Sequence, residues 1–246
     1  MNQILLSEKL YVTPDMKKKK KFFKFEFFLS VFLLCLLSSY AIYAEYDRNK
    51  SEQVSQEILA EISFEPEVEI IEEEVTVIIL NAIPEEEEVI AQTQTVQTEV
   101  EVEVPEEQKS VASDGTEYYT IGTINIPSID VKYPILSTYS DDLLKIAPCK
   151  FHGPNPNEIG NLCIAGHNYR NSKFFSKVPK LKKGDIVEIK DLSGKTVEYK
   201  VYDKFIVKPD ELECTSQLTG GKKEITLITC TDDNKKRHII KAREII

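Results

Sequence analysis

One cysteine and one arginine stand at facing ends of two apolar runs near the C-terminus. The run EITLITC ends at Cys230, the polar residues TDDNKK follow, and Arg237 opens the run RHIIKARE. The six intervening residues are enough for a hairpin that sets the end of one strand beside the start of the next. A cysteine thiolate is a nucleophile, and an arginine can hold a carbonyl oxygen or a developing oxyanion. The pattern predicts nucleophilic chemistry at a strand end.

Such a nucleophile needs a base, and histidine is the usual one because an arginine does not deprotonate in proteins. His167 follows the apolar run NLCIAG and enters a polar loop, whereas His152, in KFHGPNPN, is typical of a loop residue. His238 adjoins Arg237, so on a strand its side chain points to the opposite face. Placement at a strand end favours His167.

The other cysteines have simpler interpretations. Cys35 lies in an apolar N-terminal segment, and Cys149 and Cys163 have the surroundings of small buried hydrophobes. Cys214, in the polar stretch ELECTSQ, has no assigned role. Alternatively, two disulfides could form among the four cysteines outside the apolar segment, Cys149, Cys163, Cys214 and Cys230, which can be paired in three ways. None of them has the CxxC spacing of a structural zinc site.

No cofactor is expected. The chain has nine glycines and no glycine-rich phosphate loop, which argues against nucleotide binding. Calcium could be held by Glu158, Asp141 and Asp142, although solvated carboxylates are the simpler interpretation.

The N-terminus predicts a membrane anchor. Residues 27–44 contain no charge, lysines 17–21 and 24 precede them, and Glu45 and Asp47 follow. This asymmetry predicts a single pass with the basic residues 1–26 in the cytoplasm and the rest outside the cell. A cleaved signal peptide is the alternative, with Ala44 as the last residue before the cleavage site. Such a site also has a small residue two positions earlier, where this chain has Ile42. Met16 is an alternative start to Met1.

The net charge of −10 comes from one segment. Residues 45–115 contain 21 acidic and 3 basic side chains and predict a disordered acidic stalk, although VTVIIL within it could pair as a strand.

Residues 116–246 are sufficient for one globular domain. This domain is rich in short β-like runs, with helical pieces expected at SDDLLKIA and FFSKVPKL, which predicts an all-β barrel or sandwich. In TVEYKVYDKF, Val197, Tyr199, Val201 and Asp203 are expected to share one face.

Three ordered motifs of this domain resemble the sortases, the cysteine transpeptidases of the outer surface of Gram-positive bacteria. Thr226 to Cys230 match the family signature Thr-Leu-X-Thr-Cys, Gly166 and His167 match its Gly-His strand end, and residues 184–187 match its GDIV run. GTINIPSIDVKYPIL is also similar to the opening strands of the sortase barrel. The resemblance covers about residues 118–244.

The resemblance implies a closed eight-stranded β-barrel in which Cys230 is the nucleophile, His167 the general acid and base, and Arg237 the group that binds the substrate and the oxyanion. The turn after Cys230 is shorter than in many sortases, so Arg243 remains a second candidate. Ile206 to Lys223 should form the wall that reads the substrate.

The reaction implied is cleavage of a Leu-Pro-X-Thr-Gly-like sorting signal on surface proteins through a thioacyl-enzyme. The acyl group then passes to an amine of a peptidoglycan precursor or a pilin lysine. No nucleic acid partner is implied. Three alternatives stay open: a membrane-bound endopeptidase that uses water, a non-catalytic surface scaffold with Cys230 as a core thiol, and a redox switch in which Cys230 pairs with Cys214 or Cys163.

Overall fold

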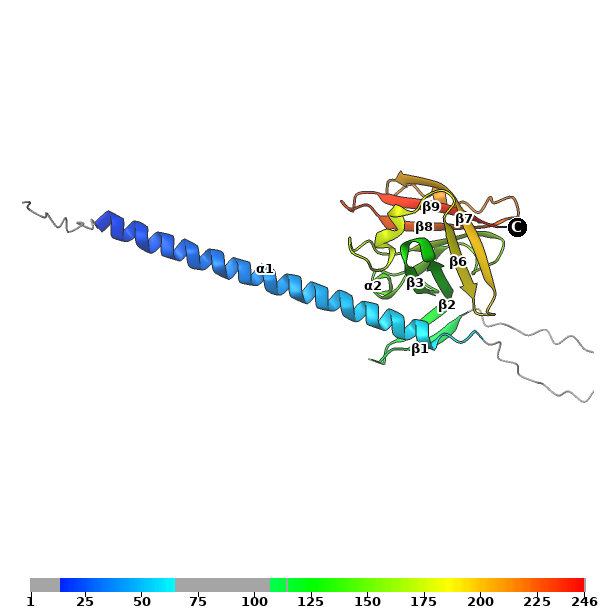
Figure 1. The fold of residues 1–246 in the computed structure, drawn as a ribbon, viewed down its shortest axis with the longest axis horizontal. Helices are drawn as coiled ribbons and strands as arrows, with labels where there is room; N and C mark the ends of the chain where they lie inside the picture. Colours follow the sequence, from blue (N-terminus) through cyan, green and yellow to red (C-terminus); the bar gives the residue numbers. More distant parts are fainter. Residues whose placement is uncertain (1–13, 65–106, 114, 246) are drawn as a thin grey trace, which may run out of the picture. The chain divides into compact units, whose positions relative to one another are not determined.

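The computed structural model describes residues 14–64, 107–113 and 115–245 of the chain (Figure 1). The strands are β1 (Gln108–Val111), β2 (Glu117–Ile126), β3 (Val131–Leu136), β4 (Cys149–His152), β5 (Gly160–Ala165), β6 (Ile186–Asp191), β7 (Thr196–Val207), β8 (Lys223–Cys230) and β9 (Arg237–Glu244). The helices are α1 (Pro14–Glu61), α2 (Leu143–Ile146) and the 3-10 turns η1 (Pro127–Ile129), η2 (Phe175–Lys180) and η3 (Glu213–Thr215).

Eight of the strands close into a barrel, as predicted. They follow one another in the order β2-β3-β4-β5-β8-β9-β7-β6, and β6 pairs back onto β2. The pairs β3–β4 and β5–β8 are parallel and the other pairs are antiparallel. Strand β1 lies outside this ring and pairs with β2 alone among the described strands. Closure removes the exposed edges that an open sheet would present.

The barrel interior is filled by side chains that alternate along the strands. Ile124, Ile164, Ile189, Leu227 and Ile240 are fully buried in one cluster. At the closing seam, Gly122 has φ +150°, and a Cβ there would lie 2.3 Å from the Lys190 carbonyl oxygen, so β2 approaches β6 only because no side chain intervenes.

Seven runs of the sequence predict strands, and all seven form them: YYTIGTINIP (β2), VKYPIL (β3), NLCIAG (β5), DIVEI (β6), TVEYKVYDKFIV (β7), EITLITC (β8) and RHIIKARE (β9). Val197, Tyr199 and Val201 pack in the core from β7, as expected. A bulge after Val201 leaves Asp203 only half-buried. Both expected helical pieces are present but short, as α2 and η2. Strand β4 was not predicted, because its sequence CKFH lacks an alternating pattern.

The structure differs from the predicted stalk, residues 45–115, at both of its ends. Residues 45–61 continue α1, and residues 108–111 form β1. Val54 and Ile58 are buried against the barrel and contribute roughly 1.5–3 kcal/mol each by leaving water, which offsets the repulsion of the acidic residues around them. Ordered structure therefore begins before the expected residue 116. Residues 65–106, including VTVIIL, lie outside the described residues.

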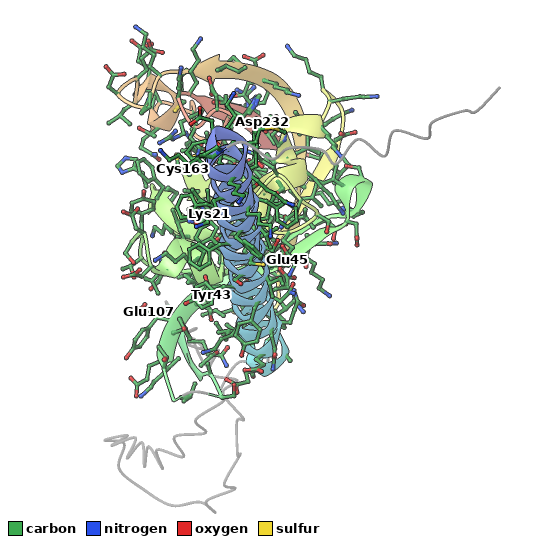
Figure 2. All side chains as sticks on the ribbon, turned by 90° about the vertical axis from the view of Figure 1, so that its left-hand side faces the viewer. Lys21, Tyr43, Glu45, Glu107, Cys163 and Asp232 are labelled. Carbon is green, nitrogen blue, oxygen red and sulfur yellow. The ribbon has the colours of Figure 1, made fainter. Side chains whose placement is uncertain are left out.

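The N-terminal unit, which ends at Ser51, is the first part of α1. Every residue from 21 to 43 is exposed, so apolar side chains lie on all sides of this stretch of the helix, for example Phe28 at 67% and Leu37 at 66% exposure. Lys21 and Tyr43 mark its ends in Figure 2. The helix is long and apolar enough to cross a membrane by length and composition. A helix that is apolar all round suits an apolar surrounding, so this part of α1 is a candidate membrane span.

Candidate active site

Cys230 and Arg237 lie directly opposite each other at the turn end of the β8–β9 hairpin. Residues opposite each other in an antiparallel pair present their side chains on the same face of the sheet. The connecting turn is closed by the Thr231 N–H, which donates to the Lys236 carbonyl at 3.0 Å, and by Asn234 with φ +59°. The short turn thus keeps the Cys230 thiol and the Arg237 guanidinium side by side on one face of the hairpin.

His167 reaches the same end of the barrel from β5. Strands β5 and β8 are parallel with Ala165 opposite Ile228, so two further residues bring His167 level with Cys230. The Gly166 N–H donates to the Ile228 carbonyl at 3.0 Å, and the Thr229 hydroxyl donates to the Gly166 carbonyl at 2.8 Å. These bonds continue the ladder beyond the strand ends and fix where the histidine emerges.

The loop after His167 is packed tightly beneath it. A Cβ on Gly166 would lie 2.5 Å from the Phe175 ring, so the glycine of the Gly-His motif is required for packing. Phe174 is fully buried with φ +49° and ψ −130°, a conformation that costs on the order of 1–3 kcal/mol in a residue with a side chain. The surrounding contacts must therefore hold it there.

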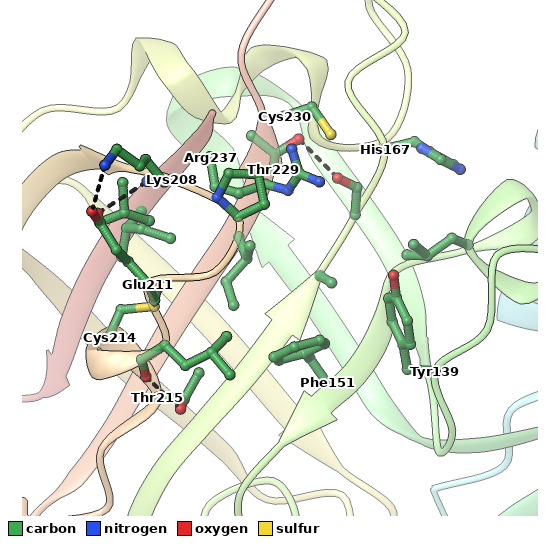
Figure 3. A pocket seen from close by; sticks show the side chains of 18 of the residues that line it. Tyr139, Phe151, His167, Lys208, Glu211, Cys214, Thr215, Thr229, Cys230 and Arg237 are labelled. Carbon is green, nitrogen blue, oxygen red and sulfur yellow. Dashed lines mark hydrogen bonds and ion pairs between the residues drawn. The ribbon is translucent and has the colours of Figure 1, made fainter. Parts of the chain in front are cut away.

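The three residues line one pocket of about 250 Å³. Figure 3 shows Cys230 and Arg237 together, with His167 to their right in this view. No hydrogen bond joins the Cys230 thiol to the His167 ring in the described part of the chain. Hydrogen bonds between an acid–base pair often form only when substrate is bound.

The end of β7 and the segment that follows it form one wall of this pocket, through Val207, Pro209, Leu212 and Thr215. The lining residues of this wall fall in the first part of the expected range 206–223, and none of them lies between 216 and 223. The opposite side is formed by an aromatic pair that was not predicted, Tyr139 and Phe151, whose rings meet edge to face with centroids 5.2 Å apart.

Burial shifts the pKa of the histidine of the site and of the nearby cysteines in opposite directions. Burial lowers the pKa of His167 below the ordinary 6.5, while the charge of Asp141 raises this pKa and that of Lys145 lowers it. His167 is therefore mostly neutral at neutral pH and able to accept a proton. Burial raises the pKa of Cys149 and of Cys163 to about 12, and also raises that of Cys214.

The rival residues lie elsewhere. Arg243 donates to the buried Glu224 carboxylate at 2.6 and 2.8 Å and stands over the Tyr202 ring. His152 is exposed on β4, and neither it nor His238 is among the residues that line the pocket. Among the described residues, the Arg237 guanidinium, in contrast, donates hydrogen bonds only to carbonyls of its own turn, those of Asn234 and Lys236.

Neither disulfides nor a metal cluster connects these residues. All five cysteines are free thiols, so the two-disulfide alternative does not correspond to this structure. Within the described ranges, no three acidic, histidine or cysteine side chains gather to hold a metal ion. Asp142 pairs with Lys145 instead, and Glu158 accepts a hydrogen bond from the Asn155 N–H.

One residue that sequence reasoning missed is Asn168. Its amide donates to the Cys230 carbonyl at 3.0 Å and to the Asp232 carboxylate at 3.1 Å. It therefore ties the loop that carries His167 to the turn that follows Cys230. Its position beside the histidine was the available signal, but the partners lie more than sixty residues away along the chain.

The family model described as the sortase domain matches residues 124–245, which contain all of these features. The chain belongs to the sortase family. It is 35% identical to sortase A of Bacillus anthracis over 123 residues, which cover 49% of this chain and 57% of that protein. It is 29% identical to sortase A of Staphylococcus aureus over 146 residues, 58% of this chain and 66% of that protein.

Among solved structures, the sortase resembles a Clostridium perfringens sortase D5 transpeptidase at 32% identity and a TM-score of 0.48, covering 52% of this chain and 79% of the other. The chain thus spans between about half and two thirds of the length of the curated sortases that it matches.

Proposed function

We propose that this sortase is a membrane-anchored cysteine transpeptidase. It would cleave a Leu-Pro-X-Thr-Gly-like signal on surface proteins and pass the acyl group to an amine of a peptidoglycan precursor or a pilin lysine. The observation that carries the proposal is that Cys230, Arg237 and His167 line one pocket at a common end of the barrel. Family membership supports the reaction class, and the apolar part of α1 supports the anchor.

In the first step, neutral His167 accepts the proton of the Cys230 thiol, and the thiolate attacks the scissile carbonyl carbon. Arg237 donates N–H groups to the carbonyl oxygen as that oxygen gains negative charge. The carbon–nitrogen bond then breaks, and the leaving amine takes the proton from His167. A thioester between Cys230 and the N-terminal part of the substrate remains.

In the second step, the acceptor amine attacks this thioester and loses a proton to His167. The carbon–sulfur bond breaks, a new amide bond forms, and the Cys230 sulfur recovers a proton. No oxidant or cofactor is required. Water in place of the amine would give hydrolysis through the same residues.

Charge supports the proposed orientation, with residues 1–26 cytoplasmic and the barrel outside the cell. Five consecutive lysines, 17–21, precede the apolar run, and Glu45 and Asp47 follow it. The barrel would then face the cell wall.

Trapping the covalent intermediate tests the reaction. The full chain in detergent micelles is incubated with a library of Leu-Pro-X-Thr-Gly-like peptides, and its intact mass is measured. We expect an increase equal to the N-terminal peptide fragment less water, absent from Cys230→Ala. Adding triglycine should convert the adduct into a ligated peptide. Only hydrolysed peptide would indicate the endopeptidase, and no adduct despite a free, titratable Cys230 would contradict both enzymatic functions.

The two arginines of β9 offer a matched comparison. Arg237→Gln is expected to lower kcat/KM about 10²- to 10³-fold because one donor to the developing oxyanion is lost. Arg243→Gln should leave kcat/KM nearly unchanged but destabilise the fold by about 2 kcal/mol, since buried Glu224 loses its closest partner. Peptide kinetics and urea unfolding separate the two effects. The opposite pattern would assign the substrate contact to Arg243.

A further inference from the structure

The last turns of α1 form part of the catalytic unit of the chain. We call Glu52–Glu61 the docked segment; it lies beside β1 in Figure 1. Its Val54 and Ile58 share a buried cluster with Leu144, which also lines the active-site pocket. Glu61 accepts a hydrogen bond from the Val111 N–H at 3.1 Å. The segment is thus held by apolar packing and by polar contacts.

One polar contact of the docked segment reaches further than the others. The Tyr133 hydroxyl on β3 donates to the Glu52 carboxylate, whose oxygens lie at 2.9 and 3.0 Å. The same hydroxyl accepts the Phe174 N–H at 3.0 Å. A tyrosine hydroxyl has one proton, so directing it to Glu52 turns the oxygen lone pairs toward Phe174. Glu52 thereby fixes the orientation of this hydroxyl.

Phe174 in turn supports His167. Its ring stacks on Tyr133 with centroids 5.1 Å apart and meets the edge of Tyr169 at 5.5 Å, while Tyr169 lies 5.0 Å from the His167 ring. The Phe175 N–H donates to the His167 carbonyl at 3.0 Å. Because Phe174 has an unfavourable backbone conformation, it depends on these contacts. Loss of the hydrogen bond from the Phe174 N–H to the Tyr133 hydroxyl should therefore change the orientation of the His167 ring.

We propose that Glu52 and Tyr133 are positioning residues for His167, and that the docked segment of α1 thereby sets the rate of the catalytic step. Neither residue lines the active-site pocket, so neither is placed to contact substrate there. The part that concerns rate rests on the proposed function. The part that concerns the orientation of the ring does not.

The test compares four variants of the full chain in detergent micelles. Glu52→Ala and Tyr133→Phe remove the two sides of the hydrogen bond, whereas Glu52→Gln keeps an oxygen that can accept it. Glu61→Ala is the matched control, because Glu61 lies on the same segment but bonds to β1. The readouts are the single-turnover rate of thioacyl formation, KM, urea unfolding and ¹³C NMR of labelled histidine. With three histidines in the chain, each ring can be assigned separately.

We expect Glu52→Ala and Tyr133→Phe to lower the acylation rate about tenfold or more with KM unchanged, since misplacing a catalytic group slows chemistry without weakening binding. Both should shift the His167 ring signals and leave those of His152 in place. Glu52→Gln should restore most of the rate. Glu61→Ala should change stability only.

The proposal is overturned if the acylation rate follows stability alone across the four variants, or if the His167 signals stay unchanged in Tyr133→Phe. If wild-type protein forms no thioacyl adduct, the proposed function fails at that point. The NMR comparison still decides whether Glu52 and Tyr133 orient the His167 ring. The two failures are therefore distinguishable.

Discussion

Cys230→Ala is expected to reduce peptide cleavage to the detection limit, a loss of at least about 10⁴-fold, because no other thiol of the domain can take its place. Cys149, Cys163 and Cys214 are buried, and burial raises the pKa of each. A buried thiol with a raised pKa holds almost no thiolate at neutral pH. Cys230, in contrast, is half-buried and lines the pocket.

Iodoacetamide labelling followed by peptide mapping checks this assignment. Among the four cysteines of the barrel domain, we expect Cys230 to be modified first and activity to fall in proportion. The Cys230→Ala protein should keep the wild-type unfolding midpoint to within about 1 kcal/mol, since a half-buried side chain contributes little packing. Cleavage that persists in this variant would support the scaffold interpretation of Cys230.

His167→Gln is expected to lower kcat/KM by about 10²- to 10⁴-fold, the usual contribution of a positioned acid and base. Glutamine retains polar atoms of similar reach but neither accepts nor delivers a proton near neutral pH. The rate should be followed by release of a fluorescent C-terminal fragment. His152→Gln is the matched control, and we expect it to behave as wild type because His152 is outside the pocket.

The pH profile identifies His167 independently. Because burial lowers its pKa, kcat/KM should fall on the acid side with a midpoint below 6.5. Asp141 raises this pKa and Lys145 lowers it, so Asp141→Asn should move the midpoint to lower pH and Lys145→Gln to higher pH. Shifts in the reverse directions would assign the acid limb to another group.

Protonation of His167 should also couple to stability. Its folded pKa lies below the unfolded value, so the unfolded chain binds the proton first as the pH falls. The stability that neutral His167 contributes is present above the unfolded pKa and is lost as the pH falls through the folded pKa. Urea unfolding across this range should show a smaller pH dependence in His167→Gln.

Local patterns were sufficient for most of the barrel. Alternating or continuous apolar runs located seven strands, because the pleat turns every second side chain toward the core. The short strand β4 was missed since CKFH shows no such alternation. The barrel order with β8 beside β5 was not predicted, because it depends on contacts between residues far apart in sequence. The family resemblance implied only a closed barrel of eight strands.

The acidic segment shows where composition misleads. Residues 45–61 contain enough charge to predict disorder, yet Val54 and Ile58, one helical turn apart, place two apolar side chains on one face. This apolar face stabilises the helix only because it packs against the barrel, and a local sequence pattern contains no information about that contact. Packing of the same segment also places Glu52 beside the Tyr133 hydroxyl, although the sequence does not distinguish Glu52 from its acidic neighbours.

The sequence by itself determined the family motifs, the strand-end positions of Cys230 and His167, and the preference for Arg237, because residue type and strand periodicity are local properties. Only the tertiary structure decided that Arg243 is held by Glu224, that Asn168 joins the two loops of the site, and that Tyr133 lies between Glu52 and Phe174. Each of these contacts joins residues 19 or more positions apart. The β8–β9 pairing brings Arg243 to Glu224, the β5–β8 pairing brings Asn168 to Cys230, and packing of the end of α1 brings Glu52 to Tyr133.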